Sequence, residues 1–193
     1  PSEEKMWGRA ESLLASGDRA RTRQAVERHL RPMLVRFPKG EHADEARHHV
    51  DQFEMNIIEK RMKMKINTGG EPKNKNELLL MTAWRFLIFG DKQKTKEECE
   101  RFLDRVKDVE ENRTLRLLAE RRISKIDAED SAPPTSKEYL ELKLNEADDL
   151  VRAEKSRSAR RIWRSITELY REREFPAEVA EADEALKQYE TAE

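Results

Sequence analysis

The stretch that decides the fold runs from Leu87 to Thr95 and reads LIFGDKQKT. A matching stretch, LASGDRART, runs from Leu14 to Thr22, so the two are related by a shift of 73 positions. A glycine after a run of apolar residues is typical of a helix end, because glycine adopts a positive φ without strain. The repeated Gly-Asp pair therefore predicts a tight turn between two helices and indicates an internal repeat.

The repeat continues on both sides of the Gly-Asp pair. A further shift of 63 positions, which takes Thr95 to Ser158, gives a third copy without gaps. In that copy Ala153-Glu154 replaces the Gly-Asp pair, so we expect a different turn geometry there. Apolar or small residues coincide at many aligned positions, among them Met6 and Leu79; Ala10 and Ala83; Leu30, Leu103 and Ile166; Ala46, Ala119 and Ala182; and Val50, Ile123 and Leu186.

Within each copy, apolar residues recur at three- and four-residue steps in three successive segments. Such steps place the apolar side chains on one face of a helix. Val and Ile are sparse while Glu, Lys, Arg, Leu and Ala dominate, which favours helices over strands. We therefore predict an all-α fold of about nine helices. In the first helix of the third copy, the predicted apolar face consists of Tyr139, Leu142, Ala147, Leu150 and Val151.

The helices are predicted to form three blocks of three, stacked as right-handed hairpins in an α-solenoid. Together the blocks make a single helical-repeat domain over residues 1–193. Glycine and proline residues mark flexible joints near 67–75 and 130–134. The last helix of the first block is predicted to extend beyond the repeat, roughly over 56–66. The predicted blocks span residues 2–67, 75–129 and 135–191.

Several polar and proline positions carry local predictions. The hydroxyls of Thr22, Thr95 and Ser158 stand where the second helix of each copy begins, so we expect them to cap those helices. The segments TKEE from Thr95 and TSKE from Thr135 both fit a capping box. Pro32 lies inside the second helix of the first copy, where it is expected to kink or split that helix.

Composition and charge limit the class of protein. Charged residues make up 41% of the chain and hydrophobic residues 36%, with a formal net charge of only −1. A balanced charge gives no general footprint for nucleic acid or for an anionic membrane. Cys99 is the single cysteine, so no internal disulfide forms; this fits a reducing compartment and leaves an export compartment open. The start at Pro1 suggests a piece of a longer protein.

One group of residues resembles a known repeat class. The first copy carries Leu30 and Leu34, then Phe37-Pro38, then Ala43, Ala46 and Val50, and the second carries Trp84, Leu87 and Gly90. This pattern is similar to the tetratricopeptide class, in the form found in bacterial periplasmic assembly lipoproteins. The resemblance implies a TPR-like stack of helical hairpins that binds proteins or peptides along a concave face and scaffolds larger assemblies.

Catalytic motifs are missing from the sequence. It contains no glycine-rich phosphate loop, no Gly-x-Ser-x-Gly and no His-Glu-x-x-His. We therefore expect no enzyme activity, no cofactor, no small-molecule substrate and no catalytic, cofactor-binding or metal-binding residues. His42, Glu45 and His49 share one helix face, as metal ligands do, but a polar edge beside the apolar stripe is the favoured interpretation. Cys99 falls in a core stripe, which favours a buried structural thiol.

Two basic stretches are candidate surfaces for an anionic partner. They run from Lys60 to Lys65 and from Lys155 to Arg164, the second with Trp163 interleaved. Acidic residues stand close to both stretches, so solvated helix faces are favoured over a nucleic-acid site. Trp7, Trp84 and Trp163 all fall on apolar stripes and are predicted to pack in the core. The segment RRIS from Arg121 resembles a kinase target by a short match only.

The function predicted from these patterns is a non-catalytic scaffold for protein–protein interaction. Its partner is a protein or a peptide, and no membrane association is expected of this stretch. Two alternatives stay open at this point. One is a regulatory or sensory domain of a larger bacterial signalling protein, such as a kinase. The other is a nucleic-acid-binding module that uses the basic stretches.

Overall fold

The computed structural model describes residues 1–129 and 131–190. Asp130, in the predicted joint 130–134, and residues 191–193, at the end of the predicted third block and of the chain, lie outside the described residues. The described part is all-helical and contains no strand, as the composition predicts. It includes nine helices, and the predicted helix number is confirmed.

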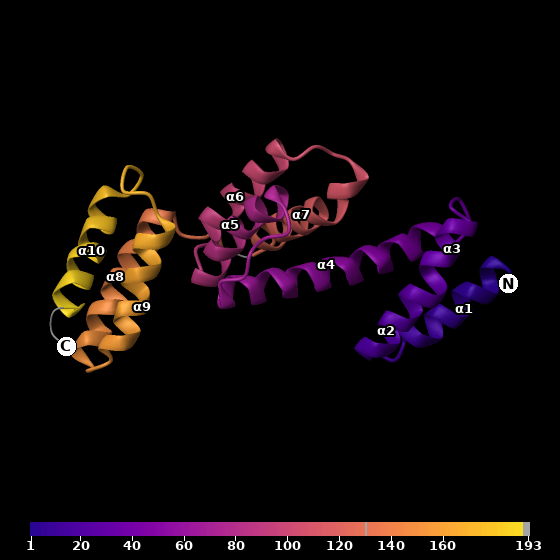
Figure 1. Cartoon of the computed structure of the whole chain (residues 1–193), viewed down its shortest axis with the longest axis horizontal. Coiled ribbons are helices and arrows are strands. Elements are labelled where there is room, and N and C mark those ends of the chain that lie inside the picture. The colour runs from indigo at the N-terminus through magenta and orange to yellow at the C-terminus, as the bar shows by residue number, and fades with distance from the viewer. Residues whose placement is uncertain (130, 191–193) are drawn as a thin grey trace. The chain divides into compact units, whose positions relative to one another are not determined.

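The helices follow one another along the chain with short connections (Figure 1). Their order is α1 (Glu3–Leu14), α2 (Arg19–Ala25), a π-helical turn (Val26–Leu30), α3 (Arg31–Arg36), α4 (Ala43–Thr68), α5 (Lys75–Phe89), α6 (Lys92–Arg105), a 3-10 turn (Glu110–Asn112), α7 (Arg113–Asp127), α8 (Ser136–Arg152), α9 (Ser156–Leu169) and α10 (Pro176–Glu190). Because α2, the π-helical turn and α3 run on without a break, they count as one helix.

The chain divides into two compact units. Unit 1 comprises Pro1–Pro72 and Val106–Leu118, and unit 2 comprises Lys73–Arg105 and Ala119–Glu193. The boundary therefore falls inside α7, whose two halves belong to different units. The predicted grouping into three blocks of one repeat domain stays a prediction.

Unit 1 has a core built from α1, the α2–α3 helix and α4. Small residues at the centre of this core, such as Ala10, Ala25 and Ala46, are fully buried and let the helix backbones approach closely. The other buried members of the core are Met6, Val26, Leu30 and Met33. The apolar stripes predicted for the first copy thus meet in one place.

The interruption between α2 and α3 has its cause in Pro32. Proline has no N–H to donate to the carbonyl four residues earlier, so the helix cannot keep its regular bonding here. The chain instead widens into a π-helical turn, in which the N–H of Arg31 donates to the carbonyl of Val26. The disturbance predicted at Pro32 takes the form of an interruption in the α-helical bonding, after which the helix resumes at once as α3.

Helix α4 is continuous over 26 residues, which confirms the predicted extension of this helix. It ends at Gly69, which takes the left-handed φ of 70°. Its middle binds the beginning of α7 within unit 1. The guanidinium of Arg113 donates to both carboxylate oxygens of Asp51 at 3.2 and 2.6 Å, and Thr114 donates to Glu54 at 3.0 Å. The hydrogen bond to Asp51 also raises the pKa of Arg113.

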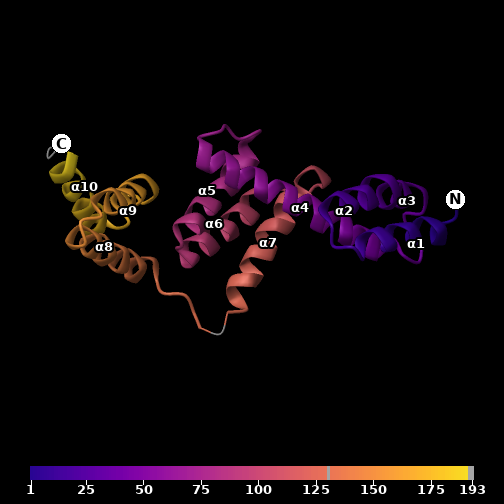
Figure 2. The same cartoon turned by 90° about the horizontal axis from the view of Figure 1, so that it is seen from below.

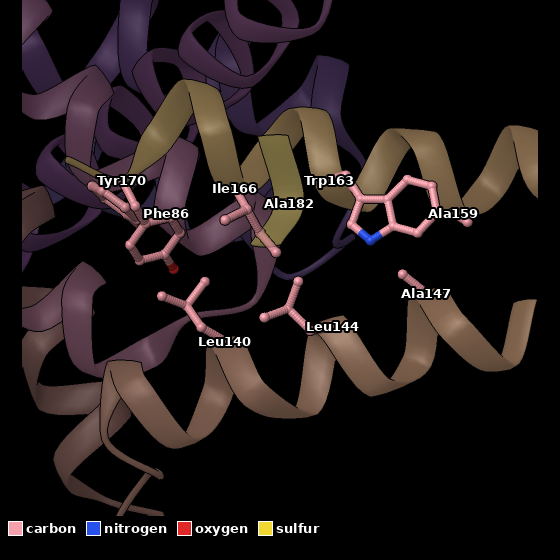
Figure 3. Close-up of a cluster of buried hydrophobic side chains, with 9 residues drawn as sticks. All are labelled: Phe86, Leu140, Leu144, Ala147, Ala159, Trp163, Ile166, Tyr170 and Ala182. Atoms are coloured by element: carbon pink, nitrogen blue, oxygen red, sulfur yellow. The ribbon is translucent and has the colours of Figure 1, made fainter. Parts of the chain in front are cut away.

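Helices α8, α9 and α10 of unit 2 pack against one another, as Figure 2 shows. Their shared core, drawn in Figure 3, also takes in Phe86 from α5. Leu140, Leu144 and Ala147 line the α8 side of this core. The prediction that Leu142 belongs to this face is wrong, because it is 60% exposed. Two residues correspond to about 200° around a helix, so Leu142 lies opposite Leu140.

Helices α5 and α6 pack together. Polar contacts join them to the second half of α7. Lys96 pairs with Asp127 at 2.5 Å, and the guanidinium of Arg122 lies 5.6 Å from the ring centre of Trp84. Trp84 and Trp163 are buried, as predicted. Within the described residues, no helix combines the length and the apolar character that a membrane crossing needs.

Candidate binding sites and the buried turn

The second Gly-Asp turn joins α5 to α6. Gly90 has φ 101°, and the N–H groups of Gly90 and Asp91 donate to the carbonyls of Leu87 and Phe86 at 3.2 and 3.1 Å. This is the Schellman arrangement that ends many helices. A Cβ on residue 90 would collide with the hydroxyl of Tyr139. Glycine is therefore required here both for its backbone conformation and for the space it leaves.

Asp91 begins the next helix and is the buried polar centre of the turn. Its Oδ1 accepts the N–H of Lys94 at 2.9 Å, and its backbone carbonyl accepts the hydroxyl of Thr95 at 2.6 Å. Asp91 is only 1% exposed. The prediction that Thr95 caps this helix is wrong, and so is its capping box. The aspartate supplies the cap, while the threonine bonds back to it from the first turn.

Tyr170, at the end of α9, reaches this aspartate from the other side. Its hydroxyl donates to Oδ2 of Asp91 at 2.6 Å. Burial, followed by this hydrogen bond, raises the pKa of Tyr170 far above its ordinary value. Nearby, the hydroxyl of Tyr139 donates to the carbonyl of Phe89 at 2.7 Å, and burial raises its pKa too. The turn is thereby bonded to α8 and to the residue that ends α9, a role that its sequence did not predict.

The first Gly-Asp turn repeats the bonds that begin the second helix but not the Schellman pattern, because the N–H of Asp18 donates to the hydroxyl of Ser16 at 3.3 Å. This turn lies in solvent. Gly17 has φ 65°, the carboxylate of Asp18 accepts the N–H of Arg21 at 2.9 Å, and Thr22 donates to the carbonyl of Asp18 at 2.9 Å. Asp18 is exposed, and no atom lies within 4 Å of a Cβ built on Gly17. The same motif therefore begins its second helix in the same way without a covering helix.

The third turn keeps the geometry of the second, which contradicts the expectation of a different one. Glu154 takes the left-handed φ of 58°, and the N–H groups of Glu154 and Lys155 donate to the carbonyls of Val151 and Leu150 at 2.9 and 2.8 Å. The Schellman pattern is displaced by one position relative to the alignment. Ser158 is not a cap, because α9 begins at Ser156. The capping box at Thr135 is confirmed.

Unit 1 carries a surface groove of about 410 Å³ between the α1–α2 turn and α4. Its lining combines apolar and basic side chains, and among the described residues no carboxylate lines it. Ile57 is 40% exposed, so apolar surface is accessible in the groove. The side chains that set this character are Leu14, Arg19, His49, Phe53, Ile57 and Lys60.

Unit 2 carries a second pocket, of about 500 Å³, formed by α5, α6, the end of α9 and the segment that follows it. Leu79, Phe86 and Leu169 supply its apolar lining. Two acidic residues, Glu98 and Glu174, also line it. Against them stand five basic residues: Lys94, Arg101, Arg105, Arg171 and Arg173. This set is called the basic pocket below.

His42 and His49, which the sequence predicts on one helix face with Glu45, both contact the ring of Trp7. His42 stacks on Trp7 with ring centres 4.8 Å apart, and its Nδ1 lies 3.7 Å from a carboxylate oxygen of Glu45. His49 lies on the same tryptophan at 6.1 Å, and burial lowers its pKa. Nowhere in residues 1–129 and 131–190 do three His, Cys, Asp or Glu side chains form a group able to hold a metal ion.

Cys99 and the two basic stretches are the other candidates that the sequence offers. Cys99 is fully buried, as predicted, and burial raises its pKa to about 12, so the thiol is unreactive at neutral pH. Of the basic stretch from Lys60 to Lys65, Met62 is buried and Met64 is exposed. In the stretch from Lys155 to Arg164 the arginines lie mainly on the outer side of α9. Neither stretch contributes to the basic pocket.

Comparisons with protein-family models, with curated proteins and with solved structures give no match to this chain. The described residues form an all-helical structure whose surface hollows include an apolar groove with a basic rim and a strongly basic pocket.

Proposed function

We propose that this chain is a non-catalytic scaffold that holds a protein or peptide partner, built of TPR-like helical repeats. Partial recurrence at the aligned turns supports the repeat, because the aspartate cap occurs at the first two turns and the Schellman bonds occur at the last two. So do the three-helix cores of α1 to α4 and of α8 to α10. An experimental structure showing a right-handed stack of hairpins would support the repeat further, and any other stacking would overturn it.

The observation that carries the binding proposal is the groove in unit 1. A solvent-accessible apolar floor with a polar rim suits an apolar anchor residue of a partner segment. Ile57 and Phe53 provide the floor, and Arg19 and Lys60 provide the rim. Burial of one large apolar side chain in such a groove stabilises a complex by roughly 1.5–3 kcal/mol, which is enough to decide specificity.

The test selects peptides from a random displayed library on the whole chain and measures their affinities by fluorescence anisotropy. The substitution Ile57→Asp places a charge on the groove floor, and we expect at least a roughly tenfold loss of affinity. Val35→Asp is the matched control, because Val35 is 85% exposed on α3 and does not line the groove. Equal loss in both variants, or the failure of any peptide to bind, would contradict the proposal.

A further inference from the structure

The lining of the basic pocket in unit 2 has an imbalance of charge that the chain as a whole does not have. Five basic and two acidic side chains line it, an excess of three positive charges in a chain whose net charge is −1. Two other pockets of unit 2 are lined by more acidic than basic side chains, for example Glu141, Glu178 and Glu181. Of these three pockets, the basic pocket is therefore the one with an excess of positive charge.

Both acidic side chains of the pocket form ion pairs with basic side chains of the same pocket. Lys94, whose side chain is only 9% exposed, donates to Glu174 at 3.1 Å, and this bond lowers the pKa of Glu174. Arg101 pairs with Glu98 at 2.5 Å. These pairs fix the wall of the pocket. The charge of Arg171 acts on Glu174 as well, after Lys94, but forms no ion pair with it.

Three arginines remain, and they provide the binding chemistry. The guanidinium groups of Arg105, Arg171 and Arg173 have no hydrogen-bond or ion-pair partner among the described residues. All three are exposed and come from two segments, the end of α6 and the link from α9 to α10. A guanidinium binds a carboxylate through two parallel hydrogen bonds, so this arrangement suits several carboxylates held together.

The apolar lining separates a peptide from a nucleic acid as the occupant. Phe86 is 4% exposed and packs edge-on to Tyr170, so it offers no face on which a base could stack. A volume of about 500 Å³ holds a few side chains, one of them apolar against Leu79 and Leu169.

We propose that the basic pocket binds an acidic segment of a partner protein, with carboxylates on Arg105, Arg171 and Arg173 and one apolar side chain on the pocket floor. The inference rests on the proposed scaffold function only in that the partner is a protein. It adds a second contact site, distinct from the groove of unit 1, and it states the chemistry of the segment bound there.

The experiment titrates the whole chain into a fluorescein-labelled peptide, Glu-Asp-Glu-Leu-Asp-Glu-Asp, and measures anisotropy at low and at physiological salt. We expect saturable binding that weakens with salt, since exposed charges are screened. The double variant Arg171→Glu with Arg173→Glu should weaken binding roughly tenfold or more, as two charge-assisted contacts become repulsive. Circular dichroism of each variant verifies that its helices remain.

The matched control is the double variant Arg157→Glu with Arg161→Glu, which makes the same charge change on exposed positions of α9 outside the pocket. We expect it to bind almost as the parent does. Equal losses in the two double variants would overturn the proposal, because binding would then follow net charge alone. So would equal affinity for the Gln and Asn version of the peptide, or tighter binding of inorganic phosphate or of single-stranded DNA.

Variants in the two sites separate this inference from the proposed function. Ile57→Asp should leave binding of the acidic peptide unchanged, and the arginine variants should leave groove-selected peptides bound. If no peptide binds the groove while the acidic peptide still depends on Arg171 and Arg173, the groove proposal fails and the basic-pocket proposal stands. The opposite pattern rejects the basic pocket alone.

Discussion

The two Gly-Asp turns share a sequence motif, a left-handed glycine and the bonds that begin the second helix, yet only one is part of a core. At Gly17-Asp18 the carboxylate caps a helix in solvent, and nothing covers the glycine. At Gly90-Asp91 the same carboxylate also accepts a buried tyrosine hydroxyl, and the glycine faces Tyr139. The motif therefore determines the local turn, whereas the energetic importance of each turn depends on the helices that cover it.

The largest expected difference between the two turns is at the aspartate. Asp91→Ala removes a helix cap and leaves the hydroxyl of Tyr170 buried without its acceptor, so we expect a loss of about 3 kcal/mol in local stability. Asp18→Ala removes an exposed cap only, and a loss of about 1 kcal/mol is expected. Hydrogen exchange of the α5–α6 and α1–α2 amides measures each turn in its own unit. Equal losses at the two turns would remove the distinction.

The glycines come next. Gly90→Ala forces an L-residue to φ 101° and pushes its methyl group into the hydroxyl of Tyr139, so we expect a loss of about 2 kcal/mol. Gly17→Ala pays only for the left-handed backbone at φ 65°, a loss of about 1 kcal/mol. The same exchange measurement applies. The double variant Gly90→Ala with Tyr139→Phe should recover part of the loss, since the colliding oxygen is gone.

Alkaline pH should destabilise the second unit first. In the unfolded chain the thiol of Cys99 ionises near 9.0, whereas in the folded chain burial holds its pKa at about 12. The unfolded state therefore loses its proton first, and stability falls as pH rises from about 9 toward 12, by at most about 1.4 kcal/mol per pH unit. The raised pKa of Tyr170 acts in the same direction.

Limited proteolysis between pH 8 and pH 11, read by mass spectrometry, locates this effect. The single cysteine and all three tyrosines fall in unit 2, so cleavage should increase there before it increases in unit 1. Cys99→Ala should flatten the pH dependence. Simultaneous cleavage of both units with an unchanged slope in that variant would show that other groups control alkaline unfolding.

The smallest expected difference concerns the threonines. Thr95 is fully buried and donates to the carbonyl of Asp91, so Thr95→Val should cost about 1 kcal/mol for one lost hydrogen bond. Thr22 makes the matching bond on the surface, where water replaces it, and Thr22→Val should cost less than about 0.5 kcal/mol. Urea titrations of the two variants, followed by tryptophan fluorescence, compare them directly. A larger cost at Thr22 would contradict the ordering.

Sequence reasoning succeeded where the structure depends on neighbouring residues. Local propensity and apolar spacing predict the helical class, the helix number and the interruption at Pro32. They also predict the long α4 and the buried Cys99. It failed where two neighbouring choices looked alike. The spacing predicts Leu142 on the buried face of α8, but Leu140 and Leu144 occupy that face. The sequence predicts Thr95 as the helix cap, but Asp91 supplies it, and both side chains can accept an N–H.

Sequence patterns do not predict the basic pocket of unit 2 or the groove of unit 1. No spacing rule connects Arg105 to Arg171 and Arg173, because they line one pocket only when α5 packs against both α6 and α9. The groove in unit 1 joins Leu14 to Ile57 for the same reason.

The sequence by itself determined the helices, their ends and the repeated Gly-Asp turn, since each depends on contacts within a few residues. Only the tertiary structure decided which turn is buried and where positive charge gathers. These outcomes depend on side chains far apart in the chain, such as Asp91 and Tyr170, whose hydrogen bond forms only after the helices that carry them have packed. A motif can therefore repeat faithfully along a chain while its physical role changes from surface cap to buried anchor.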